Sequence, residues 1–459
     1  MPLLWSYFLI LQKESESSDV DKIRKYKMAP LHRDAELSSG ASPSSPTTDQ
    51  FSTDVIYGKI GNPSSPHLED VLGWEETRGD RLTAKIATEV SRIAKSNMET
   101  LVASKSYRRL CAESITGSCT APSESCEFIS HSDIELGEVI GEGGFSEIYK
   151  IRTARDSSET SSSSSASSSL DDTRRSDSSK PNYEQDEFVI KVLKKEVMRN
   201  PAEFALCASD IVKEAVLMSL LDHPHILKVR GMSSSGTMAF QAARRHDSFF
   251  VMMDLLGDTL MDRLRSWMRT EHRLKAFSFK QRAERKQQRK RLFQERIKVG
   301  TQIADALTYL HEHHIAHRDI KPGNIGFDSE GNAKLFDFDS CRVLPDSEGD
   351  GLFRLTRRVG TLRYMAPEVG LSKPYNLKAD VYSYALVLYA IVGMREPYIE
   401  MQASEQEVNV FHKGTRPHVR PKWPQVIQDL LKSMWQVDCQ QRPSMAFAFE
   451  TLKTLSNNN

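Results

Sequence analysis

The most constraining feature of this 459-residue chain is a short run of reactive side chains at residues 317–324, which reads His-Arg-Asp-Ile-Lys-Pro-Gly-Asn. It follows a segment with helical spacing of apolar residues, 297–310, which predicts a buried helix. Asp319 can accept the proton of an attacking hydroxyl group, and Lys321 can neutralise charge on a phosphoryl group in transfer. Asn324, five residues after Asp319, can reach a metal ion. These groups make the run a candidate catalytic loop.

A second candidate metal ligand lies 18 residues after Asp319, in the sequence Asp337-Phe338-Asp339. Mg²⁺ prefers oxygen ligands and usually takes one or two from the protein, with phosphate oxygens and water completing its shell. Asp337, Asn324 and the oxygens of a bound phosphate fit this preference. The sequence therefore predicts a magnesium site formed by Asn324 and Asp337.

A glycine-rich segment at residues 140–148 lies between two strand-like runs. Gly141 and Gly143 lack a Cβ atom, so the backbone there can approach phosphate oxygens and offer N–H groups. An ordinary glycine turn is the alternative, because such turns are common. The strands on both sides argue against a Rossmann dinucleotide site, in which a helix follows the glycines.

Lys191 lies in an apolar, strand-like run, Phe188 to Val192, where a charge is costly unless it is paired. Glu214 follows 23 residues later on a predicted helix and is a candidate partner. Such a pair could hold the ammonium group on the α- and β-phosphates of a nucleotide. A lysine at a solvated strand edge and an ordinary surface glutamate are the alternatives.

Together with residues 360–368, Gly-Thr-Leu-Arg-Tyr-Met-Ala-Pro-Glu, these motifs resemble the eukaryotic protein kinase family, and in style the tyrosine-kinase-like group of its Ser/Thr members. The resemblance covers residues 133–455. It implies an α+β, two-lobed protein kinase fold, with a small β-rich N-lobe and a large α-helical C-lobe. It also implies that ATP and Mg²⁺ bind between the lobes.

The resemblance assigns roles to individual residues. It implies that Met252 is the gatekeeper of the adenine pocket, with the backbone of Met253 and Leu255 meeting adenine. It gives Asp380 and the pair Arg442–Glu368 structural roles. The expected catalytic residues are Asp319, Lys321 and Asn324, the metal ligands are Asn324 and Asp337, and the cofactor-binding residues are Ile140, Gly141, Gly143, Ile148, Val189, Lys191, Glu214, Met252, Met253 and Leu255.

The expected activity is transfer of the γ-phosphate of ATP to Ser or Thr hydroxyls of protein substrates. Lys321 stands two residues after Asp319, where tyrosine kinases usually have Ala-Ala-Arg, and Thr361 stands where Ser/Thr kinases have a threonine that contacts both. A pseudokinase scaffold that binds nucleotide without turnover is the alternative, although the residues usually lost in such proteins are present. A small-molecule kinase of the same fold is a third interpretation.

Three positions depart from the family pattern. Ser146 replaces the third glycine of the glycine-rich segment, and Val189 stands where the family usually has alanine. Asp339 replaces the glycine that ends the Asp-Phe-Gly motif. Because aspartate tolerates left-handed backbone better than most residues but adds a negative charge, we expect an unusual on/off equilibrium or metal affinity.

Regulation by phosphorylation is a further expectation from the resemblance. Arg318, directly before the catalytic aspartate, often binds a phosphate on the activation segment in this family. The candidate acceptors are Ser340, Ser347 and Thr356, and we favour Thr356 because it lies between two arginines.

Outside these motifs the chain divides by composition. Residues 1–132 are an N-terminal extension, which we expect to be largely disordered with an amphipathic helix near 82–105. The kinase domain, 133–455, carries a Ser-rich insert at 154–187, within which 13 of the 23 residues from 157 to 179 are serine. It also carries a basic insert at 265–296. The basic insert is read as a solvated helical extension, a dock for an acidic protein partner, or a surface for nucleic acid or anionic lipid.

Amino-acid composition limits the other functions and cellular locations to be considered. Lys and Arg total 62, as do Asp and Glu, so no global field marks a nucleic-acid binder and no specific nucleic acid is predicted. The six cysteines form no Cys-x-x-Cys pair, which disfavours a zinc or redox motif and suggests a reducing compartment. No apolar run is long enough to span a bilayer, and residues 1–11 make a poor signal peptide. A cytoplasmic location, with nuclear access open, is the expectation.

Overall fold

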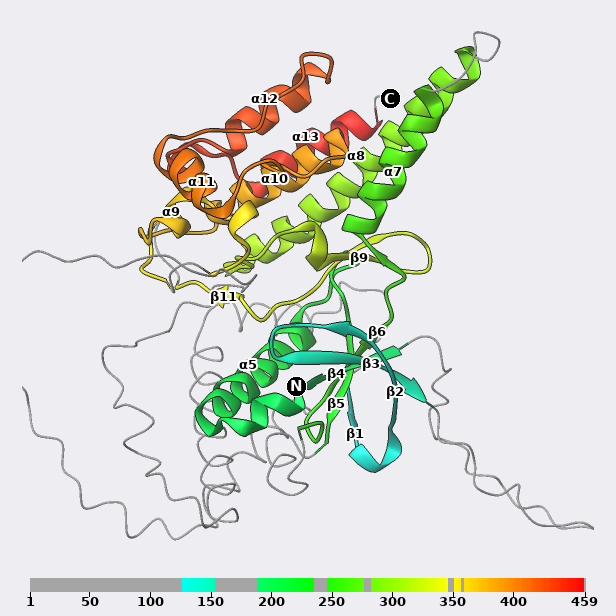
Figure 1. Ribbon diagram of the computed structural model, residues 1–459, viewed down its shortest axis with the longest axis vertical. Helices are drawn as coiled ribbons and strands as arrows, with labels where there is room; N and C mark the ends of the chain where they lie inside the picture. Colours follow the sequence, from blue (N-terminus) through cyan, green and yellow to red (C-terminus); the bar gives the residue numbers. More distant parts are fainter. Residues whose placement is uncertain are drawn as a thin grey trace, which may run out of the picture. The chain divides into compact units, whose positions relative to one another are not determined.

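The computed structural model describes residues 126–152, 188–234, 246–275, 282–345, 351–355 and 359–457, and all structural statements below concern these residues. The expected amphipathic helix near 82–105, the body of the Ser-rich insert, Ser347 and Thr356 lie outside them. Strands dominate the first part of the described chain and helices dominate the second (Figure 1). We call these parts the N-lobe and the C-lobe.

The N-lobe is built on one six-stranded sheet with the order β1-β5-β6-β4-β3-β2. Neighbouring strands are antiparallel except β1 and β5, which are parallel. Although β1 lies N-terminal to residue 133, it belongs to this sheet. The strands are β1 (Glu127–Ile129), β2 (Glu135–Glu142), β3 (Ser146–Arg152), β4 (Phe188–Leu193), β5 (Val229–Ser233) and β6 (Val251–Asp254). Since β3 and β4 pair directly, the Ser-rich insert connects two adjacent strands.

Alternation along β4 separates two chemical environments. Ile190 and Val192 point into an apolar cluster with Phe250 and Met252. Val189 and Lys191 point to the opposite face, because successive side chains in a strand alternate. Helix α5 (Pro201–Leu220) contacts the sheet and buries an apolar stripe that includes Phe204, Ala208, Ile211, Ala215 and Met218. Pro201 suits the first turn of this helix, where its missing N–H is not needed.

The C-lobe packs around helix α10 (Lys378–Gly393), which is buried along nearly its whole length. Helices α8 (Arg282–Glu312), α12 (Gln425–Met434) and α13 (Met445–Asn457) surround this core, and α7 (Leu260–Lys275) runs beside the first half of α8 (Figure 1). Shorter helices are α9 (Pro367–Gly370) and α11 (Ala403–Gln406). Single turns are η2 (His131–Asp133), η3 (Lys195–Arg199), η5 (Pro322–Asn324), η6 (Leu362–Tyr364), η7 (Glu407–His412, a π-helix) and η8 (Cys439–Gln441). Among the described helices, none combines the length and the apolar character that a bilayer span requires.

Two small sheets hold the reactive loops. One has the order β10-β9-β7, with β7 (Asp258–Thr259), β9 (Ile325–Phe327) and β10 (Ala333–Leu335). The other pairs β8 (Ile315–Ala316) with β11 (Arg342–Val343). The loop with Asp319 lies between β8 and β9, and Asp337 follows β10, so pairing within these sheets fixes both loops at one place. This arrangement of an α+β chain is the one predicted from the sequence.

Candidate active site

The predicted lysine–glutamate pair is formed. Lys191, on β4, and Glu214, on α5, are separated by 2.5 Å between Nζ and Oε2, and both side chains are buried. The backbone N–H of Phe338 donates to the other oxygen of Glu214 at 3.1 Å. Glu214 therefore joins the strand lysine to the segment that carries Asp337 and Asp339.

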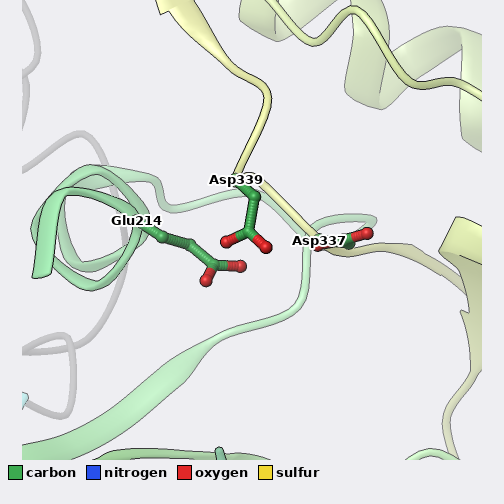
Figure 2. Close-up of side chains that lie close together, drawn as sticks. All are labelled: Glu214, Asp337 and Asp339. Carbon is green, nitrogen blue, oxygen red and sulfur yellow. The ribbon is translucent and has the colours of Figure 1, made fainter. Parts of the chain in front are cut away.

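Two further carboxylates lie beside this pair. Asp339 Oδ1 is 3.2 Å from Lys191 Nζ, and Asp337 Oδ1 is 3.8 Å from it. Carboxylate oxygens of Glu214, Asp337 and Asp339 all lie within 4.8 Å of one another. In Figure 2 the carboxylate of Asp339 is directed toward that of Glu214, with Asp337 beside them.

Burial and neighbouring charges shift the pKa values of the residues in this cluster. The pKa of Glu214 is raised well above its ordinary value by burial and by the Asp339 carboxylate. Burial would raise the pKa of Asp339 as well, but the charge of Lys191 and the hydrogen bonds that Asp339 makes with Glu214 and Lys191 together lower it to about 2. Burial opposes charge on Lys191 too, yet its carboxylate neighbours raise its pKa, so it remains an ammonium group. Asp337 has a raised pKa, chiefly because it is desolvated.

The candidate catalytic loop is tied together through Asp319. Lys321 Nζ donates to Asp319 Oδ2 at 2.6 Å, and the side-chain amide of Asn324 donates to the Asp319 carbonyl at 3.0 Å. The backbone N–H of Thr361 donates to Asp319 Oδ1 at 2.8 Å. Asn324 also donates to Asp319 Oδ2 at 3.2 Å, so three of the residues singled out from the sequence meet at one carboxylate, which is mostly shielded from solvent.

A buried aspartate at the start of α10 supports this loop. Asp380 accepts hydrogen bonds from the backbone N–H groups of His317 and Arg318, each at 2.8 Å. Burial would raise the pKa of Asp380, but the hydrogen bonds from His311 and from the Arg318 N–H lower it. Arg318 has φ 70°, a left-handed conformation that costs a non-glycine residue about 1–3 kcal/mol. Asp380 thus holds a strained loop backbone in place.

The predicted metal ligands Asn324 and Asp337 come from neighbouring segments. The backbone N–H of Phe336 donates to the Asn324 carbonyl at 3.1 Å, which ties β10 to the catalytic loop. Because the Asn324 amide nitrogen donates to Asp319, its side-chain oxygen remains as the acceptor. One carboxylate and one amide oxygen form a donor set that suits Mg²⁺.

Strand register groups the predicted nucleotide-binding residues on one face of the sheet. Gly141 pairs with Ile148, and Ile148 pairs with Lys191 across β2, β3 and β4. Val189, two residues before Lys191, shares its face and pairs with Met253. Ile140 lies at an irregularity in the β2–β3 pairing, and Gly143 closes the turn by donating to the Ser146 carbonyl at 2.8 Å.

The gatekeeper assignment to Met252 is wrong. Met252 pairs with Ile190 and belongs to the apolar cluster on the opposite face of the sheet from Lys191. Its neighbour Met253 pairs with Val189, so the Met253 side chain faces the Lys191 side. The backbone of Met253 lies between β4 and β5, whereas Leu255 follows the end of β6. A run of apolar residues gave no signal for which of two adjacent methionines faces the site.

One expectation about the loop backbone also changes. Asp339 is not among the described residues with positive φ, whereas Asp337 has φ 65°. Tolerance of left-handed backbone therefore concerns Asp337.

Arg318 donates from Nε to the Ser340 carbonyl at 2.6 Å and also contacts the hydroxyl of Tyr375. Sequence reasoning missed Tyr375, since it belongs to no motif, and missed the contact between Asp339 and Lys191.

Comparison with known proteins agrees with this geometry. A family profile described as protein kinase domain matches residues 178–452, more than half of the chain. The serine/threonine-protein kinases STY17 and STY46 of Arabidopsis thaliana are both 36% identical, over 159 and 160 residues, which is 35% of this chain and 27% of each relative. A probable serine/threonine-protein kinase of Dictyostelium discoideum, DDB_G0282895, is 29% identical over 54% of this chain and 13% of its own length. The chain thus spans only a minor part of these relatives. From the site geometry and the match to residues 178–452, the chain belongs to the protein kinase family.

Proposed function

We propose that this chain is an ATP-dependent serine/threonine protein kinase, which transfers the γ-phosphate of ATP to hydroxyl groups of protein substrates. The observation that carries the proposal is the convergence of the Lys191–Glu214 ion pair and the Asp319 loop. Lys191 reaches Asp337 at 3.8 Å, and Asp337 is tied through Phe336 to Asn324, which bonds to Asp319. Residues far apart in the chain thus face one small volume.

Lys191 would bind the α- and β-phosphates of ATP. Its carboxylate neighbours keep it charged, and Glu214 fixes its position through a contact that is buried from water. Gly141 and Ile148 would cover the nucleotide from the neighbouring strands, because they share the register of Lys191. Val189 and the Met253 side chain would line the adenine side, with backbone groups near Leu255 as hydrogen-bond partners.

Asp319 would orient the substrate hydroxyl and accept its proton at Oδ2. The Thr361 N–H holds Oδ1, so the carboxylate has a defined orientation. Lys321, now paired with Oδ2, would turn to the transferred phosphoryl group and stabilise its charge. Asn324 and Asp337 would hold Mg²⁺, which supplies neutralisation of phosphate charge. Catalysis here is mainly positioning and electrostatic stabilisation.

Preference for Ser and Thr hydroxyls rests on Lys321 and Thr361, which both contact Asp319. The names of the plant and Dictyostelium relatives, all serine/threonine-protein kinases, agree with this preference. The alternative is a pseudokinase scaffold that binds nucleotide without turnover.

A kinase assay with a degenerate peptide library and the Asp319→Asn variant tests the proposal. We expect Ser and Thr peptides to be phosphorylated, with a rate about 10²–10⁴-fold lower in Asp319→Asn because the proton acceptor is lost. Asp328→Asn, a change in a loop turn of the C-lobe, is the matched control and should keep its activity. Nucleotide binding with equal, background-level turnover in wild type and Asp319→Asn would support the pseudokinase instead.

We propose in addition that the α7–α8 hairpin docks an acidic protein partner. Glu295 accepts from Trp267 at 3.0 Å, and Glu271 contacts Arg289 at 3.7 Å, so the two helices run antiparallel and bring their basic residues together. The exposed basic side chains of the hairpin include Arg269, Arg273, Lys286, Lys290 and Arg291. Like charges four residues apart, such as Lys286 and Lys290, destabilise a helix slightly, and an acidic partner would remove this cost.

Binding of polyglutamate, RNA and anionic vesicles to the full chain tests this second proposal. We expect salt-sensitive binding of polyglutamate that is lost when Lys286, Lys290 and Arg291 are changed to alanine. The control changes three exposed lysines elsewhere in the C-lobe, Lys413, Lys432 and Lys453. Preference for RNA or vesicles over polyglutamate would contradict it.

A cytoplasmic location with nuclear access is also proposed, supported by free thiols at the described Cys126, Cys207, Cys341 and Cys439.

A further inference from the structure

Three carboxylates surround one ammonium group in the proposed nucleotide site. Glu214 and Asp339 lie 2.5 Å and 3.2 Å from Lys191 Nζ, and Asp337 lies at 3.8 Å. A lysine ammonium has three donors, and the two shortest contacts occupy two of them. Phosphate oxygens that approach Lys191 must therefore share it with these carboxylates or replace one of them.

The three carboxylates differ in how firmly they are held. Glu214 is 3% exposed and also accepts a hydrogen bond from the Phe338 N–H. Moving the Glu214 side chain away would leave this buried N–H group without a partner, which is costly. Asp337 makes the longest of the three contacts. Asp339 is 48% exposed, and its hydrogen bond to Lys191 can be exchanged for water when the side chain rotates. Asp339 is therefore the carboxylate that incoming phosphates would displace.

The backbone at this position does not require aspartate. Residue 339 is not among the described residues with positive φ, so many side chains would fit its conformation. What distinguishes Asp339 is thus its charge and its reach to Lys191. Its carboxylate is also directed toward Glu214 (Figure 2), beside the ammonium group that the phosphates would need.

We propose that Asp339 is an internal competitor of the nucleotide phosphates for Lys191, and that it weakens nucleotide binding until its side chain turns away. The proposal rests on the proposed function, because it requires Lys191 to receive the phosphates. In this role Asp339 is a positioning residue. The competition is strongest without divalent cations, since bound Mg²⁺ would offset both the phosphate charge and the excess carboxylate charge.

Calorimetric titration of the full chain with ADP in EDTA tests the competition without turnover. Asp339→Asn keeps the shape of the side chain and removes its charge, and we expect it to bind ADP about three- to fivefold more tightly, the range for a partly exposed ion pair. Asp339→Glu keeps the charge and should not bind more tightly than wild type. Glu203→Gln, at an exposed position three turns before Glu214 on α5, is the control for a general loss of negative charge and should leave the Kd unchanged.

The same titrations with excess Mg²⁺ should show a smaller gain for Asp339→Asn. Thermal unfolding checks that each variant is folded, and Asp339→Gly replaces Asp339→Asn if the latter is not. Wild type that binds ADP, with an equal or weaker affinity in the uncharged variant, would overturn the competition and leave the proposed function standing. Failure of every protein to bind ADP, with or without Mg²⁺, would overturn both.

Discussion

Lys191 shows how a buried charge depends on its immediate neighbours. Its ammonium group lies among the carboxylates of Glu214, on α5, and of Asp337 and Asp339, in the loop after β10. Of these, the buried Glu214 depends most on its charge. Removing one partner of such a buried set typically costs several kcal/mol, because the remaining charges lose their compensation. The stability of the N-lobe and the proposed binding of phosphates thus rest on the same side chain.

The change Lys191→Met tests this dependence. We expect the free energy of unfolding at neutral pH to fall by about 3 kcal/mol, since Glu214 would remain buried without its cation. The double change Lys191→Met with Glu214→Leu should recover part of this loss, because it removes the uncompensated carboxylate as well. Chemical denaturation of wild type, of the single variants Lys191→Met and Glu214→Leu, and of the double variant measures the coupling. Additive losses in the double variant would contradict it.

At the scale of elements, the loop before η6 fits closely against the catalytic loop. Gly360 has φ 97°, and a Cβ atom there would lie within 2.4 Å of the Arg318 carbonyl oxygen. The next residue, Thr361, donates its N–H to Asp319. Glycine at 360 therefore allows the segment that begins at Gly360 to approach the candidate catalytic aspartate.

The change Gly360→Ala should push these two segments apart. We expect a loss of at least about 1 kcal/mol in unfolding free energy from the backbone conformation. We also expect a loss of kinase activity, because Asp319 would no longer be oriented by the Thr361 N–H. Gly414→Ala is the matched control: Gly414 also has a positive φ of 72°, but its nearest neighbour would be a Val437 methyl group at 3.6 Å. It should lose similar stability and keep its activity. Equal activity losses in the two variants would count against the interpretation.

At the scale of the whole molecule, the segment between α5 and β5 joins the two lobes. Leu227 N–H donates to the Leu335 carbonyl and Leu335 N–H donates to the His225 carbonyl, both at 2.9 Å. His225 Nδ1 also lies 3.1 Å from the Ala333 carbonyl oxygen. This joint connects the N-lobe to β10, two residues before Asp337, so its stability bears on the geometry of the site.

Acid should weaken this joint through His223. Burial lowers the pKa of His223 from an ordinary 6.5 to about 4, and the nearby His225 acts in the same direction. Protonation of His223 therefore favours the unfolded state. The contribution of neutral His223 to the unfolding free energy is complete above pH 6.5 and is lost as the pH falls toward 4. The loss is about 2–3 kcal/mol, and Asp305, 3.6 Å from His223 Nε2, reduces it.

Unfolding free energies of wild type and His223→Asn between pH 7 and 4 measure this contribution. The variant keeps an acceptor near the His225 N–H, which His223 Nδ1 accepts at 3.1 Å. We expect a shallower decline of stability with falling pH in the variant than in wild type. Parallel curves for the two proteins would contradict the prediction, because they would show that protonation of His223 does not change the unfolding free energy in this range.

The sequence by itself determined the residue types that such chemistry requires and their order along the chain. It identified Lys191, Glu214, Asp319 and Asp337, because charged groups next to apolar strands and helices need partners and because spaced motifs limit the fold. It also predicted an α+β chain with strands before helices. These inferences depend on local spacing and composition, which a sequence contains.

Only the tertiary structure decided which faces and distances those residues share. Strand pairing moved Met252 to the apolar face and Met253 to the Lys191 face, a choice that depends on register and not on composition. Likewise, the contact of Asp339 with Lys191 joins residues 148 positions apart, so only packing of β4 against the loop after β10 could create it. Side-chain direction and long-range proximity arise from packing, which is why the site's competition for one ammonium group appeared only in three dimensions.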